Sequence, residues 1–137
     1  MEAMTHVKQG KTGEPAGLRL LGPATLLRVE GVALLVLSVL LYWVNGGNWL
    51  LFGVLLLAPD LSMLGYLAGP RVGAALYNAF HAYAMPAVVG ALGMIFASPV
   101  AIAVALIWFA HIGLDRTVGY GLKYSTSFKD THLQRVR

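Results

Sequence analysis

Ionisable side chains of the types found in metal sites lie inside apolar stretches of this 137-residue sequence. His111 and Asp115 are four residues apart, so they share one face of a helix. His81 follows Asn78 by three residues and Tyr77 by four, which places it on the same helical face as each of them. Because charge is costly at membrane depth, such residues need either partners or a function.

The composition indicates that lipid surrounds these residues. Hydrophobic residues make up 58% of the chain and charged residues only 12%, which is too apolar for a soluble domain of this size. The absence of cysteine excludes disulfides, thiolate metal sites and cysteine nucleophiles. The formal charge of +4 flanks the apolar runs, so it indicates membrane orientation and no nucleic-acid partner.

Four apolar runs carry the polar residues, and each is close to the roughly 20 residues that cross a bilayer. We therefore predict an all-α fold, a four-transmembrane-helix bundle over residues 24–118. We expect residues 1–23 to form a polar, flexible N-terminal tail and residues 119–137 to form an interfacial C-terminal tail. The predicted spans cover about residues 24–44, 48–68, 71–97 and 99–118.

Positive charges predict the topology. The connections at 45–48 and 97–99 lack Lys and Arg, whereas both tails and the connection at Arg71 carry them. Both termini are therefore expected on the same, cytoplasmic side. Pro59 immediately precedes Asp60, and a proline interrupts helical hydrogen bonds, so we expect the second helix to bend there and turn Asp60 into the bundle.

A count of depth brings the ionisable residues of all four spans to one layer. At a rise of about 1.5 Å per residue, they lie ~18–25 Å from the uncharged ends of their spans. The predicted metal ligands in this layer are His81, His111, Asp60, Asp115 and Glu30. The predicted residues that orient these ligands or contact substrate are Tyr77, Asn78, Arg116, Asp130 and His132.

Three interpretations of this layer remain open. Imidazole and carboxylate from facing helices can hold a divalent metal such as zinc, iron or manganese. Chains of Asp, Glu and His also form proton or ion relays. A structural network is the third, with Arg28 paired to Glu30, Asp115 paired to Arg116, and the histidines hydrogen-bonded at the helix interface. The spacing matches no specific metal motif.

Two stretches carry a family resemblance. "LLAPDLSMLGYLAGPRVGAALYNAFHAYAMP" and "IWFAHIGLDRTVGYGLKYSTSFKDTHLQR" resemble a bacterial family of small integral membrane proteins of unknown function, domain of unknown function 4260. The likeness covers about residues 26–135 and implies a four-helix membrane protein, multi-pass in the cell inner membrane. The family implies no activity, substrate or cofactor.

The residues then leave three functions open. The leading hypothesis is a metal-dependent, hydrolase-like membrane enzyme that acts on a lipid-like or membrane-soluble molecule from the cytoplasmic leaflet. The second is a small proton, ion or solute transport component. The third is a structural or partner-binding membrane protein without bound metal. The expected partner is the lipid bilayer, and a homo-oligomer remains open.

Overall fold

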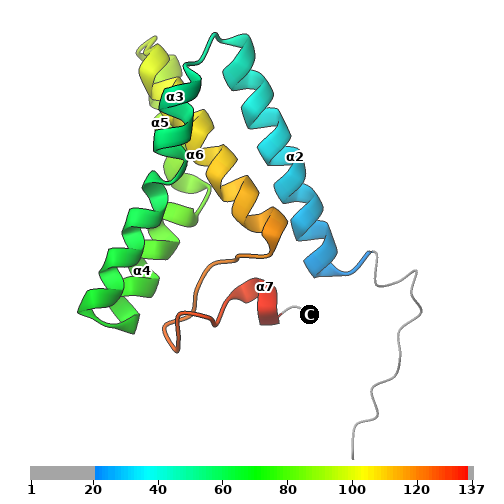
Figure 1. The fold of residues 1–137 in the computed structure, drawn as a ribbon, viewed down its shortest axis with the longest axis vertical. Helices are drawn as coiled ribbons and strands as arrows, with labels where there is room; N and C mark the ends of the chain where they lie inside the picture. The colour runs from blue at the N-terminus through cyan, green and yellow to red at the C-terminus, as the bar shows by residue number, and fades with distance from the viewer. Residues whose placement is uncertain (1–20, 136–137) are drawn as a thin grey trace, which may run out of the picture.

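The computed structural model describes residues 21–135 and is built from helices (Figure 1). In chain order these are α2 (Pro23–Val44), α3 (Trp49–Leu56), the 3₁₀ helix η1 (Ala58–Ala68), α4 (Pro70–His81), α5 (Ala84–Ile95), α6 (Pro99–Val118) and α7 (His132–Arg135). Most of the predicted N-terminal tail, residues 1–20, lies outside the described residues. The all-α fold is confirmed.

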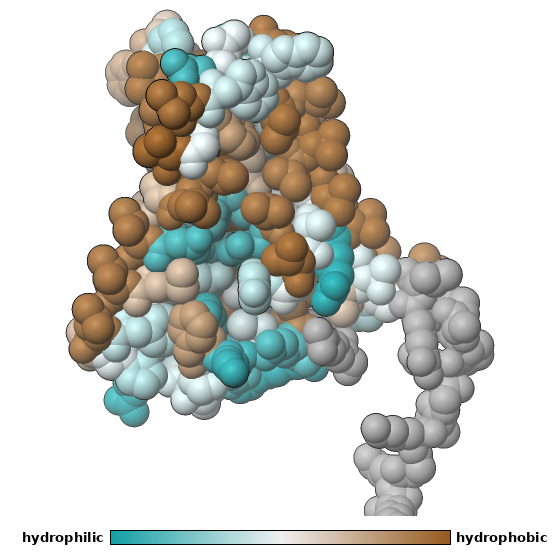
Figure 2. All heavy atoms as spheres, viewed as in Figure 1, coloured by the Kyte–Doolittle hydropathy of each residue, from teal (hydrophilic) through white to brown (hydrophobic). Residues whose placement is uncertain are grey.

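Four stretches are long and apolar enough to cross a membrane, as in a multi-pass membrane protein. They are Pro23–Val44, Trp49–Ala68, Pro70–Ile95 and Pro99–Val118, close to the predicted spans. Large apolar side chains such as Leu50 and Ile95 are exposed, as expected of surfaces in contact with lipid. Figure 2 shows hydrophobic residues over much of the visible surface, with hydrophilic residues mainly across the middle and at the bottom of the view and a few at the top.

Two of the spans are broken. In the second span α3 ends at Leu56, because Pro59 cannot donate a hydrogen bond to the preceding turn, and η1 continues the span. In the third span α4 ends at His81 and Ala82 is extended, before α5 begins at Ala84. The predicted break at Pro59 is confirmed, and the break after α4 leaves the His81 carbonyl to a side-chain donor.

Helix α6 occupies the centre of the bundle, between α2 on one side and α3 and α5 on the other (Figure 1). Two glycines set its crossing with α2. A Cβ atom on Gly31 would lie 2.9 Å from the carbonyl oxygen of Gly113, and a Cβ on Gly113 would lie 2.9 Å from the carbonyl oxygen of Gly31. Only glycine allows the two backbones to approach this closely.

The C-terminal segment folds back under the bundle at the end where α2 begins and α6 ends (Figure 1). Lys123 pairs with Thr131 in an isolated antiparallel bridge, and the Leu122 carbonyl accepts from the His132 backbone N–H at 2.9 Å. Leu133 of α7 is buried, which anchors the returning segment. We call residues 119–135 the tail. The tail lies next to α4, the first half of the third span.

Candidate metal centre

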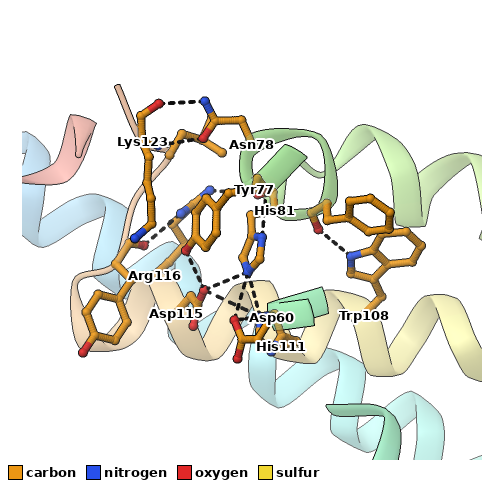
Figure 3. Close-up of polar contacts among 12 residues, drawn as sticks. Asp60, Tyr77, Asn78, His81, Trp108, His111, Asp115, Arg116 and Lys123 are labelled. Carbon is orange, nitrogen blue, oxygen red and sulfur yellow. Dashed lines mark hydrogen bonds and ion pairs between the residues drawn. The ribbon is translucent and has the colours of Figure 1, made fainter. Parts of the chain in front are cut away.

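Four ionisable side chains from three of the spans converge on one point (Figure 3). Asp60 comes from the start of η1, His81 from the last residue of α4, and His111 and Asp115 from successive turns of α6. One potential ligand atom of each lies within 4.8 Å of all the others. Both histidines are buried, and the two aspartates are partly buried.

The distances between the ligand atoms suit one small cation. The Nε2 atoms of His81 and His111 are 3.0 Å apart. Asp60 Oδ1 lies 3.4 and 3.5 Å from these nitrogens, and Asp115 Oδ2 lies 3.5 and 3.6 Å from them. Tetrahedral ligands at about 2.0–2.2 Å from a zinc ion are roughly 3.3–3.6 Å from one another. Four of these five separations fall in that range, and the fifth is slightly shorter.

The tautomer of His81 favours ligation through Nε2. Its Nδ1 lies 2.8 Å from the carbonyl oxygen of Tyr77, and because a carbonyl only accepts, Nδ1 carries the proton. The lone pair of Nε2 therefore faces His111 and the two carboxylates. His111 Nε2 can supply a proton to this lone pair, and a metal ion can replace that proton. The centre thus accepts either a proton or a cation.

Tyr77 orients two of the candidate ligands. Its ring stacks on the His81 imidazole with centroids 3.7 Å apart and planes 11° apart, while its carbonyl holds His81 Nδ1. Its hydroxyl donates to Asp115 Oδ2 at 3.2 Å. Such hydrogen bonds fix the orientation of metal ligands and raise their basicity. Tyr77 thus contacts two of the four candidate ligands.

Arg116 positions the backbone of His81. Its buried guanidinium donates through Nη2 to the His81 carbonyl at 3.0 Å and through Nη1 to the Tyr120 carbonyl at 2.8 Å. Because α4 ends at His81, the His81 carbonyl has no partner in the helix, and Arg116 supplies the donor. Within the described residues no ion pair joins Arg116 to Asp115, contrary to the structural-network interpretation.

Asn78 attaches the tail to α4 rather than contacting the ligands. Its side chain donates to the Lys123 carbonyl at 2.7 Å and accepts from the Lys123 backbone N–H at 2.7 Å. The Lys123 Nζ then lies 4.6 Å from the Tyr77 ring centroid and 3.2 Å from that of Phe128. Burial lowers the pKa of Lys123, and the charges of Asp115 and Asp60 oppose that shift. A cation thus stands beside the centre at its tail end.

Neither predicted tail residue joins the centre. Asp130 accepts hydrogen bonds from Arg135 and Thr126, which lower its pKa to about 2. His132 Nδ1 accepts from the Leu122 backbone N–H at 2.8 Å. Burial lowers the pKa of His132, with the nearby Arg116 charge acting in the same direction. Both residues take part in hydrogen bonds within the tail, and neither contacts a candidate ligand.

Glu30 is also separate from the centre. It is exposed on α2, whereas the buried face of that helix carries Gly31, Ser38 and Tyr42. The neighbouring Gly31 packs against Gly113 of α6, but Glu30 itself is turned away from this face. Within the described residues no ion pair joins Glu30 to Arg28, whereas the hydrogen-bonded histidines of the structural-network interpretation are present.

A family match agrees with the sequence resemblance. The model of a family described as Domain of unknown function (DUF4260) matches residues 24–136. The chain belongs to this family. No curated protein and no solved structure matches it. The DUF4260 match covers all four spans and the tail, so every residue of the centre lies within the family domain.

Two further residues of this DUF4260 chain escaped the sequence reasoning. The Trp108 indole donates through Nε1 to the Phe80 carbonyl at 2.6 Å, and the two rings stack with centroids 5.7 Å apart. Trp108 lies one turn before His111, and Phe80 immediately precedes His81. A tryptophan in mid-span was the available signal, because its N–H needs an acceptor when it is away from water.

Proposed function

We propose that His81, His111 and Asp115 bind one divalent transition metal with Asp60 beside it, and that the protein is a metal-dependent hydrolase working within the membrane. The spacing of the four ligand atoms is the observation that carries this proposal. Mixed imidazole and carboxylate donors favour zinc, iron or manganese over calcium or magnesium.

The supports of the four side chains differ, and this suggests separate roles. His81 is held by the Tyr77 carbonyl, Asp115 by the Tyr77 hydroxyl, and His111 by its burial in α6. Asp60 is the most exposed, with 33% of its side chain accessible. Two histidines and one carboxylate are a common set of three ligands in catalytic sites. Asp60 is then placed to act as a general base.

The chemistry follows from these roles. A bound divalent metal brings the pKa of water toward neutrality and polarises a carbonyl or phosphoryl oxygen. Asp60 accepts the proton of the attacking water and passes it to the leaving group. Lys123, on the tail side, adds positive charge close to the centre, which favours the negative charge that develops during hydrolysis.

Elemental analysis of detergent-purified protein tests metal binding. We expect one metal ion per chain in the wild type and loss of this metal in the His81→Ala, His111→Ala double variant. Glu30→Gln is the matched control, because Glu30 lies at a similar depth but outside the centre. His132→Ala controls for removal of a histidine elsewhere. Circular dichroism and gel filtration would establish that all variants fold.

A proton relay is the second candidate, favoured by the 3.0 Å contact between the two imidazoles. The same experiment separates the two. Equal, substoichiometric metal in the wild type and the double variant would contradict the hydrolase proposal and leave the relay. Metal lost from the double variant alone would contradict the relay as the main function.

A further inference from the structure

An apolar cavity of about 160 Å³ adjoins the centre. Its lining includes Ala58, Pro59, Phe80, Ile107 and Trp108. Pro59 directly precedes Asp60, Phe80 directly precedes His81, and Ile107 and Trp108 lie one turn before His111. Three of the four candidate ligands therefore come from segments that also form the cavity wall.

The cavity and the tail lie on opposite sides of the ligands. Figure 3 shows Trp108 on one side of the two histidines, with Lys123 and Arg116 on the other. Phe80 lies with Trp108, because their rings stack. A molecule bound at the centre thus meets hydrocarbon in one direction and positive charge in the other. This polarity matches an amphiphile.

The lining suits hydrocarbon alone. The one indole N–H in the wall is already bonded to the Phe80 carbonyl at 2.6 Å, and the stacked Phe80 and Trp108 rings hold each other in place. All of the lining side chains are apolar. A cavity of about 150 Å³ with such a lining stays dry and takes a group the size of benzene. A short length of alkyl chain has a similar volume.

The surroundings allow entry from the bilayer. Leu57 and Leu61, on either side of the Pro59 break, are 64% and 67% exposed, so lipid surrounds this part of η1. Asp60, whose side chain is 33% exposed, lies next to this break. A chain that lies among the lipid tails can therefore reach the cavity sideways, with its polar end beside Asp60.

We infer that the cavity binds the hydrocarbon chain of the substrate, so that the centre acts on a fatty-acyl or similar single-chain amphiphile that enters laterally from the bilayer. The inference rests on the proposed metal-dependent function and specifies its substrate class. The bond to be hydrolysed then lies close to the polar end of the amphiphile. The reason is that the cavity wall includes Pro59, next to Asp60, and Phe80, next to His81.

Trp108 provides a direct readout. The chain has three tryptophans, and Trp43→Phe with Trp49→Phe leaves Trp108 alone. The probe is 6-bromohexanohydroxamic acid, whose hydroxamate binds the metal and whose bromine quenches indole fluorescence on contact. With zinc-loaded protein in detergent, we expect saturable quenching of Trp108 that acetohydroxamic acid reverses. The same concentration of 1-bromohexane, which lacks the metal-binding group, should quench far less.

Two size-matched variants locate the chain. Ala58→Phe places a ring in the cavity, where it competes with the hydrocarbon chain of the probe for space. The probe concentration needed for half-maximal quenching should therefore rise roughly tenfold, while acetohydroxamic acid still binds. Gly53→Phe adds the same ring to the same span where nothing lies within 4 Å, so quenching should persist. Equal quenching in the two variants, or equal quenching by 1-bromohexane, would overturn the chain site while leaving the metal centre intact. Absence of metal by elemental analysis would overturn both.

Discussion

His81 and His111 belong to different spans, yet their Nε2 atoms are only 3.0 Å apart in the bundle interior. The contact depends on the break in the third span, because α4 ends at His81 and its last carbonyl is taken by Arg116. It also depends on the close packing of α6, which presents His111 and Asp115 on the same face. Two imidazoles this close in an apolar setting need a proton or a metal between them.

Tyr77→Phe should weaken metal binding without abolishing it. The change removes the hydroxyl that donates to Asp115 but keeps the ring stacked on His81 and the carbonyl that holds Nδ1. Loss of such a supporting hydrogen bond typically costs about 10–100-fold in metal affinity. Competition with a chelator of known affinity measures the change.

Tyr66→Phe is the control for this measurement. The Tyr66 hydroxyl is buried and has no hydrogen-bond partner among the described residues, so its removal should leave metal affinity unchanged. Equal affinities in wild type and Tyr77→Phe would show that Tyr77 serves packing alone.

Depth was predictable from the sequence, whereas direction around a helix was not. Counting residues from the uncharged ends placed five ionisable groups in one layer, and four of them do converge. Glu30 differs because Gly31, its neighbour, is the residue that allows α2 to approach α6. A single sequence gives no signal for which glycine marks a helix crossing, so the inward face of α2 stayed undetermined.

The tail shows a second limit of sequence reasoning. The sequence indicated an interfacial tail, and Asp130 and His132 were predicted to orient the ligands or contact substrate. The contacts that attach it run instead from Asn78 to the backbone of Lys123. Backbone partners leave no trace in side-chain composition, so pattern analysis could not find them.

Asp60→Asn should retain bound metal in full amount, whereas Asp115→Asn should lose most of it. The proposal makes Asp115 a ligand fixed by Tyr77 and Asp60 the base that faces the substrate. Elemental analysis of both purified variants measures the difference. Loss of metal from Asp60→Asn as well would mean a closed set of four protein ligands, which is typical of structural rather than catalytic sites.

Substitution of Gly31 or Gly113 by leucine should destabilise the bundle. A Cβ at either position would lie 2.9 Å or less from backbone atoms of the facing helix, which cannot move aside as a side chain can. Overpacking of this kind costs about 1–3 kcal/mol or more. Thermal unfolding in detergent should show a lower midpoint for both variants. Gly53→Leu, which adds its side chain in open space on α3, should leave the midpoint unchanged.

The orientation in the membrane is testable because the chain has no cysteine. Single cysteines at Asn48 and Ser98 should react with an impermeant maleimide added outside intact cells, and a cysteine at Arg71 should react only after the membrane is opened. The reason is the confinement of Lys and Arg to the other set of connections. Labelling of the Arg71 position in intact cells would contradict the prediction and indicate the opposite orientation.

The attachment of the tail should weaken in mild acid through His132. Its Nδ1 must be unprotonated to accept from the Leu122 N–H, and burial, together with the charge of Arg116, lowers its pKa below the usual value of about 6.5. The folded tail therefore favours neutral imidazole. Its stability is complete above about pH 6.5 and is lost as the pH falls through the lowered pKa.

A spin label on Ser125→Cys, at an exposed position of the tail, reports this change by its mobility. We expect a constrained spectrum at neutral pH and a mobile one in acid. His132→Asn offers a side-chain oxygen in place of Nδ1 that does not titrate in this range, so its spectrum should stay constrained in both conditions. Asn78→Ala removes both hydrogen bonds to Lys123 and should be mobile in both. If the wild-type spectrum does not change with pH while the Asn78→Ala spectrum is mobile, the attachment of the tail does not depend on His132.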